Sequence, residues 1–90
     1  MGYALRLTSR AVKNLAEIVD YICRNDPDAA FRFEEALLKK ADLLTLHPEV
    51  GVVVKRRVGV RYIPYRSYLI FYRIDDISKK IEILRFWHWC

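Results

Sequence analysis

Residues 47–51 divide the chain into two halves with different residue patterns. Before this segment, apolar residues recur every three or four positions, a spacing that is typical of amphipathic helices. After it, Val, Ile, Tyr and Phe gather in runs of strand length. A chain of 90 residues is too short to build two separate hydrophobic cores, so we expect one domain over residues 1–90. The pattern therefore predicts an α+β fold.

The first half predicts a short strand followed by two helices. Residues 3–8 alternate apolar and polar side chains, which favours a strand. Ser9 is expected to cap a helix over residues 9–24, and Asp26 to cap a second helix over residues 27–46 that begins with a proline. Because the connection is short, the helices should pack as an antiparallel hairpin. The expected apolar stripes are Val12, Leu15, Ile18, Val19 and Ile22 in the first helix and Ala30, Phe33, Leu37, Ala41 and Leu44 in the second.

The second half predicts four short strands that form most of a sheet. Pro64 cannot donate a backbone hydrogen bond, so its strand should be interrupted there or lie at an edge. The predicted fold is an N-terminal strand and an antiparallel helical hairpin packed on a small, mainly antiparallel β-sheet. The expected strands cover residues 52–58, 60–66, 68–75 and 80–88.

The last predicted strand carries apolar residues on both of its faces. We therefore expect it to be central, with the helical hairpin on one side and a partner on the other. Strict alternation would place Ile81, Ile83, Arg85 and Trp87 on one face, and Glu82, Leu84, Phe86 and His88 on the other.

The second half is also strongly basic. Residues 51–90 carry nine Lys and Arg against three Asp and Glu, a net charge of +6, whereas residues 1–50 carry seven against eight, a net charge of −1. The basic half holds four of the six tyrosines and both tryptophans. Such a surface suits a nucleic acid or an acidic protein as partner, through charge and stacking. A basic surface that serves only solubility is an equally good interpretation of the charge alone.

Several common kinds of site are excluded by what the sequence lacks. Its three glycines are isolated, so it has no glycine-rich phosphate loop. None of its serines has the surroundings of a catalytic nucleophile. Its cysteines and histidines do not have the spacing of a metal site; they are Cys23, His47, His88 and Cys90. We therefore expect no metal and no cofactor.

The sequence predicts a cytoplasmic protein. No apolar run approaches the roughly 20 residues that cross a bilayer. Arg6 comes too early for the apolar region of a signal peptide. In a reducing compartment a disulfide between Cys23 and Cys90 is not favoured.

The basic side chains of the second half are the remaining candidates for chemistry. Arg and Lys can stabilise charge on a phosphate in a transition state while His or Tyr moves a proton, which would allow cleavage of RNA. The same side chains can form a solvated basic face with their stems over apolar neighbours, and the sequence favours this simpler interpretation. These residues are Lys55, Arg56, Arg57, Arg61, Arg66, Arg73, Arg85 and His88.

Five segments of the chain, in their order and spacing, resemble the RelE/ParE superfamily of bacterial toxins. They are residues 11–22, 26–30, 46–51, 68–74 and 83–88, which together reach over nearly the whole chain. The resemblance implies the fold described above and a toxin of a type II toxin-antitoxin system. It also implies a cognate antitoxin whose C-terminal segment wraps the toxin in a hetero-oligomer, which agrees with a sheet that is apolar on both faces.

The superfamily has two functional branches: RelE-like members cut mRNA on the ribosome, whereas ParE-like members inhibit DNA gyrase. In the nuclease branch an arginine commonly stands three residues before the tyrosine of the central strand, and here the residue three before Tyr72 is Leu69. The run Tyr-Leu-Ile-Phe-Tyr-Arg at 68–73 is more similar to the ParE-like and plasmid-stabilisation group. The resemblance therefore favours a gyrase poison that is not an enzyme. The residues expected to contact gyrase or the antitoxin are Arg61, Arg73, Arg85, Trp87, His88 and Trp89.

Two other functions stay open. One is a ribosome-dependent mRNA endoribonuclease, in which Arg56, Arg57 or Arg61 holds the phosphate and His88 is the general acid. The Arg-x-x-His ending at 85–88 occurs in both branches and does not separate them. The other is an inactive toxin relative that acts only in the complex with the antitoxin.

Overall fold

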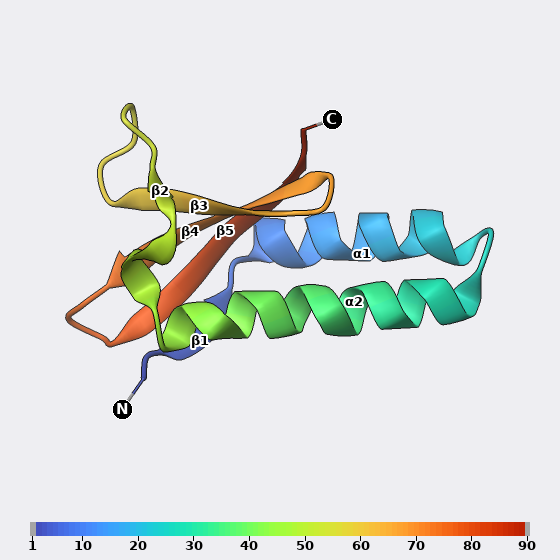
Figure 1. Cartoon of the computed structure of the whole chain (residues 1–90), viewed down its shortest axis with the longest axis horizontal. Helices are drawn as coiled ribbons and strands as arrows, with labels where there is room; N and C mark the ends of the chain where they lie inside the picture. The colour runs from blue at the N-terminus through green and yellow to red at the C-terminus, as the bar shows by residue number, and fades with distance from the viewer. Residues whose placement is uncertain (1, 90) are drawn as a thin grey trace.

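The protein folds into a five-stranded mixed sheet with two antiparallel helices packed against one of its faces (Figure 1). The computed structural model describes residues 2–89, so the thiol of Cys90 lies outside it. The strand order is β1-β5-β4-β3-β2, with β1 parallel to β5 and the other neighbours antiparallel. The predicted α+β fold is thereby confirmed. The elements are β1 (Ala4–Leu7), α1 (Ser9–Cys23), α2 (Pro27–Asp42), the 3₁₀ turns η1 (Leu43–Thr45) and η2 (Pro48–Val50), β2 (Val52–Val53), β3 (Val60–Tyr65), β4 (Tyr68–Asp75) and β5 (Lys80–His88).

The two helices begin at side-chain caps. Asp26 caps α2 as predicted, because its carboxylate accepts a hydrogen bond of 3.1 Å from the Ala29 amide. For α1 the predicted cap, Ser9, is wrong by one residue: the hydroxyl of Thr8 accepts from the Ala11 amide at 3.1 Å. The same hydroxyl donates to the Leu84 carbonyl at 3.0 Å, so the cap also ties α1 to β5. Neither helix, nor any other in the described chain, is long and apolar enough to span a membrane.

The apolar stripe of α2 is predicted correctly and that of α1 only in part. All five residues expected on the stripe of the second helix are buried, but α2 ends at Asp42 rather than near residue 46, so Leu44 lies in η1. In α1, Val12 is 54% exposed and Ala11 is fully buried in its place, beside Leu15. One position corresponds to about 100° of rotation on a helix, so the small Ala11 side chain faces the rest of the core. A spacing pattern gives more weight to the larger apolar residue, so it predicted Val12 rather than Ala11 on the buried face.

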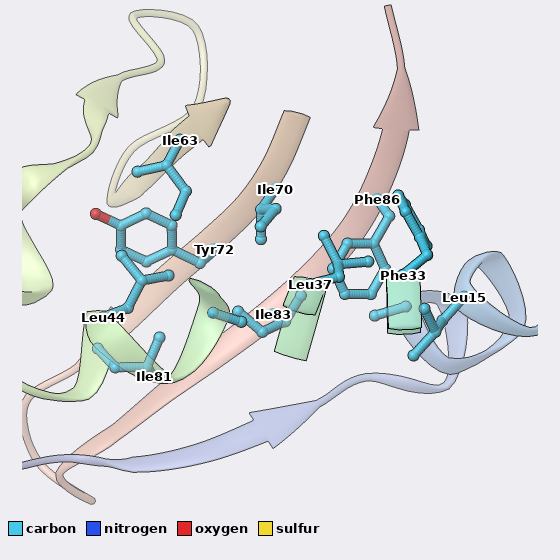
Figure 2. Close-up of a cluster of buried hydrophobic side chains, with 12 residues drawn as sticks. Leu15, Phe33, Leu37, Leu44, Ile63, Ile70, Tyr72, Ile81, Ile83 and Phe86 are labelled. Carbon is cyan, nitrogen blue, oxygen red and sulfur yellow. The ribbon is translucent and has the colours of Figure 1, made fainter. Parts of the chain in front are cut away.

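The core lies between the helices and one face of the sheet, and Figure 2 shows its larger side chains. Leu37 of α2 packs there with Ile70 of β4 and Ile83 of β5, all three without solvent exposure. Burying a large aliphatic side chain contributes about 1.5–3 kcal/mol, so this layer fixes the position of the helices on the sheet. The remaining large members are Leu15, Phe33, Leu44, Ile63, Tyr72, Ile81 and Phe86.

The strand predicted over residues 52–58 is wrong after Val53. Only Val52 and Val53 pair with β3, and a turn follows in which the Arg57 amide donates to the Val54 carbonyl at 3.1 Å. Gly59 has a φ of +79°, a conformation that few residues other than glycine adopt, and it closes the turn. Because β2 is so short, the outer side of β3 is an edge at Pro64, as predicted.

β5 is an interior strand as predicted, but a β-bulge changes its faces. Phe71 pairs with Arg85 and Tyr72 with Ile83, so Leu84 is an extra residue on β5. The predicted grouping of Ile81 and Ile83 with Arg85 and Trp87 is therefore wrong. Ile81, Ile83 and Phe86 are buried toward the helices, whereas Leu84 and Arg85 both line a pocket on the opposite face.

Candidate recognition surface

The face of the sheet that turns away from the helices is the main candidate site. In the described chain both helices lie on the other side (Figure 1). Side chains alternate along a strand, so the neighbours of the buried core residues point to this uncovered face. We call it the open face. Its residues are Val60 and Tyr62 of β3, Leu69, Phe71 and Arg73 of β4, and Glu82, Leu84, Arg85 and Trp87 of β5.

A pocket of about 400 Å³ lies on the open face and is rich in arginine. Its basic groups come from separate parts of the chain: Arg10 from the first turn of α1, Arg57 from the β2–β3 loop, and Arg73 and Arg85 from the sheet. We call it the arginine pocket. Its other lining residues are Thr8 and the apolar Val54, Val60, Phe71 and Leu84.

Arg85 is the most constrained of these arginines. Its guanidinium carbon lies 4.2 Å from the centre of the Trp87 ring, a cation–π contact. Its Nε is buried and has no hydrogen-bond partner among the described residues. Burial lowers the pKa of Arg85, and the like charges of Arg10 and Arg57 lower it further. The positive charge of Arg85 is thus held in place without a balancing carboxylate from the described residues.

The only carboxylate in this part of the described sheet is already shared. Glu82 pairs with Arg6 of β1 and lies 3.9 Å from Arg73 of β4. Among residues 2–89, no carboxylate lies within ion-pair distance of Arg10, Arg57 or Arg85. The arginine pocket therefore keeps a net positive charge and is suited to bind an anionic group.

Tyr72 and Arg61 fix the chain segment that leads into the β2–β3 loop. The Tyr72 hydroxyl donates to the Pro48 carbonyl at 2.6 Å and accepts from the Gly51 amide at 2.9 Å. Burial raises the pKa of Tyr72, while the Gly51 amide and the charge of Arg61 act in the opposite direction. Arg61 donates to the carbonyls of Glu49, at 3.2 Å, and Gly51, at 2.9 Å. This guanidinium is thus bound to backbone rather than directed into the arginine pocket.

His88 lies on the helix side of the sheet. It shares a face with Phe86 by alternation, and the bulge at Leu84 turns that face toward the helices; its ring centre is 5.1 Å from that of Tyr68. It lines a second, shallow pocket with residues of α1, including Asn14, Glu17, Ile18 and Tyr21. Arg57 and Arg85 line the arginine pocket on the opposite face, so the structure does not bring His88 together with them.

The predicted site residues therefore fall into three places. Arg57, Arg73, Arg85 and Trp87 gather on the open face, Arg61 is bound to the carbonyls of Glu49 and Gly51, and His88 lies on the helix side of the sheet. Trp89 is 55% exposed, and its amide continues the pairing of β5 by donating to the Ser67 carbonyl at 3.1 Å. The functional roles assigned to these residues stay predictions.

Sequence reasoning missed Arg10 as a member of the pocket. This residue stands in the first turn of α1, far along the chain from the basic half. It reaches the open face because β1 pairs in parallel with β5 and delivers the start of α1 beside Leu84. A pairing between the two ends of a chain has no local signal, so only the fold reveals this arginine.

Comparisons with known proteins agree on one family. Residues 5–89 match the family model described as "ParE toxin of type II toxin-antitoxin system, parDE". A curated protein of Sinorhizobium fredii, named "Putative toxin Y4kP", is 36% identical over an alignment of 88 positions that covers 93% of this chain and 85% of the relative.

Three solved structures share the fold. The chromosomal ParDE toxin-antitoxin system of P. aeruginosa gives a TM-score of 0.84 at 20% identity, covering 98% of this chain and 97% of that one. The RelBE2 toxin-antitoxin complex of Mycobacterium tuberculosis gives 0.72 at 28% identity, covering 98% and 99%. A mutant of the E. coli toxin RelE in its free state gives 0.68 at 20% identity, covering 97% and 83%.

Proposed function

Because the chain belongs to the ParE toxin family of type II toxin-antitoxin systems, we propose that it arrests growth by binding and poisoning DNA gyrase. A cognate antitoxin neutralises it in a hetero-oligomer, as the toxin-antitoxin structures with the same fold suggest. The match to the ParE model over residues 5–89 supports gyrase as the target. So does Leu69, which stands where the nuclease branch commonly has an arginine.

One observation carries the proposal: the open face offers a recognition surface, and within the described residues the predicted general acid His88 does not lie beside its cations. A general acid must lie within hydrogen-bond reach of the atom that it protonates, either directly or through one water. His88 lines a pocket on the opposite side of the sheet from Arg57 and Arg85. Apolar and aromatic side chains with a basic rim suit protein recognition, and no bond needs to be cleaved. We assign Arg73, Arg85 and Trp87 to the interface, with Trp89 at its margin.

The arginine pocket keeps an mRNA endoribonuclease as the second candidate function. Arg57 and Arg85 line one pocket and are suited to hold a phosphate there. In that case another group would have to move the proton, or His88 would have to act from a different conformation. The order in which DNA and protein synthesis stop, and the effect of His88→Ala on toxicity, separate the two functions.

The first prediction concerns which synthesis stops first. We expect that inducing the protein alone in growing bacteria lowers incorporation of labelled thymidine within minutes, before incorporation of labelled amino acids falls. A gyrase poison blocks DNA replication first, whereas cleavage of mRNA stops translation first. Co-induction of the antitoxin is the control and should restore both. An early collapse of protein synthesis would favour the nuclease instead, and no change in either would indicate an inactive relative.

The second prediction concerns His88. We expect His88→Ala to retain growth arrest within about threefold of the original protein, since a peripheral contact costs little. Loss of a general acid would reduce a nuclease rate by about 10²- to 10⁴-fold. His47→Ala, which removes the only other histidine, is the matched control. The readout is the inducer concentration that halves the growth rate. A folded His88→Ala protein without toxicity would argue against the binding-only mechanism.

A further inference from the structure

Three arginines converge on the arginine pocket from positions that are distant in sequence. Arg10 belongs to α1, Arg57 to the β2–β3 loop and Arg85 to β5, and none has a carboxylate partner within residues 2–89. Like charges repel, so gathering three of them in one pocket costs free energy in the isolated chain. An anion seated between them would remove that cost, and its hydrogen bonds would be charge-assisted.

The buried Nε atom of Arg85 gives a second, independent sign of a missing partner. Its Nε is buried and makes no hydrogen bond with the described residues. Buried polar groups are nearly always paired, and a donor without a partner is a costly exception. The Trp87 ring covers one face of the guanidinium, which leaves its edge as the surface available for an acceptor. A carboxylate or a phosphate fits an arginine edge, often through two parallel hydrogen bonds, so the apolar lining must decide between them.

The apolar part of the pocket favours an amino-acid side chain over a nucleotide. Val54, Val60 and Leu84 are aliphatic and offer no aromatic ring for a base to stack on. Of the aromatic rings nearby, Phe71 lies against Tyr62 at 5.7 Å between ring centres, and Trp87 has Arg85 against one side of its ring. Aliphatic lining beside unpaired arginines matches an acidic residue that is followed or preceded by an apolar one.

We propose that the arginine pocket binds the carboxylate of an Asp or Glu side chain of the antitoxin, with an apolar neighbour of that residue packed on Val54, Val60 and Leu84. This inference rests on the proposed function, which makes an antitoxin the partner of the chain. It assigns one anchor within that interface. The antitoxin segment lies across the open face, so its binding competes with any target that uses Arg85 or Trp87.

The test measures the affinity of the full-length antitoxin for full-length toxin variants. We expect Arg57→Gln and Arg10→Gln each to weaken binding by about 10- to 100-fold, the range expected for lost charge-assisted hydrogen bonds. Arg32→Gln, on the exposed surface of α2, removes the same charge outside the pocket and should change the affinity less than about threefold. Arg57 lies in an exposed loop, so its variant tests the pocket even if Arg85→Gln fails to fold.

A double-mutant cycle identifies the partner residue. Each acidic residue of the antitoxin is changed to its amide, and one such change should make Arg57→Gln cost nothing further. The same variants are titrated with a single-stranded RNA oligonucleotide. The proposal is overturned if Arg57→Gln and Arg32→Gln bind the antitoxin with equal affinity. It is also overturned if Arg57→Gln weakens binding of the RNA but not of the antitoxin. None of these measurements involves gyrase, so a different toxin target would sink the proposed function and leave this test intact.

Discussion

Gly51→Ala is expected to destabilise the protein by about 3 kcal/mol, the upper range for forcing an extra methyl group into a packed site. A Cβ at Gly51 would lie 2.5 Å from the Tyr72 hydroxyl oxygen, 2.7 Å from its Cε1 and 2.9 Å from the Tyr62 carbonyl oxygen. Tyr72 is fully buried and cannot swing away, so the backbone at Gly51 would have to move. That movement would also break the hydrogen bond from the Gly51 amide to the tyrosine.

The control for this prediction is Gly59→Ala. A Cβ at Gly59 meets nothing within 4 Å, but φ is +79° there, so its cost is backbone strain of about 1–2 kcal/mol. At Gly51 φ is −74°, which any residue adopts, so the whole effect is steric. Urea unfolding of both variants measures the difference. A loss of stability below about 1 kcal/mol for Gly51→Ala would show that the backbone at residue 51 moves easily to make room for the methyl group.

A double variant of Gly51 and Tyr72 sharpens the same test. Tyr72→Phe alone leaves the Gly51 amide and the Pro48 carbonyl without their partner, which costs about 1–3 kcal/mol. In the double variant the clash with the hydroxyl is gone. The stability lost by the double variant should therefore be smaller than the sum of the two single losses. Full additivity would mean that the hydroxyl contact is not what excludes a side chain at residue 51.

Most of the fold could be predicted because its signals are local. β4 and β5 have the predicted bounds, and Asp26 followed by Pro27 marks the start of α2 correctly. The wrong predictions share a different cause, because contacts between distant segments of the chain decide them. Val54 and Val58 have strand propensity, but β3 pairs with only two residues of β2 and the chain turns at Val54. Strand propensity carries no information about where a pairing ends.

The candidate site was predictable in composition and not in arrangement. Charge counting directed attention to Arg57, Arg73 and Arg85, and the fold places all three in one pocket. Which side of the sheet Arg85 and His88 each face depends on one extra residue, Leu84, in the ladder between β4 and β5. Period-two alternation assigns every later side chain to the wrong face once a bulge is missed. A bulge has no signature in the run Ile83 to Phe86, so spacing alone could not reveal it.

Trp87→Ala is expected to weaken gyrase binding by about 30- to 1,000-fold, because truncating an interface hot-spot tryptophan costs about 2–4 kcal/mol. Trp87 is 45% exposed on the open face, opposite Leu69. The Arg85 guanidinium at 4.2 Å holds its ring in one orientation, so little side-chain entropy is lost on binding. A large aromatic ring that is both exposed and fixed is the kind of group on which interfaces concentrate their affinity.

The readouts are the affinity of the purified toxin for gyrase and the concentration that halves DNA supercoiling, and each variant is first checked for cooperative unfolding. Ile77→Ala is the matched control, because Ile77 is 97% exposed in the β4–β5 turn and lies outside the open face. Its affinity should stay within about twofold. If Trp87→Ala binds gyrase as tightly as Ile77→Ala does, the open face is not the gyrase contact. The exposed apolar residues of the helical hairpin, such as Tyr21 and Phe31, would then be the next surface to test.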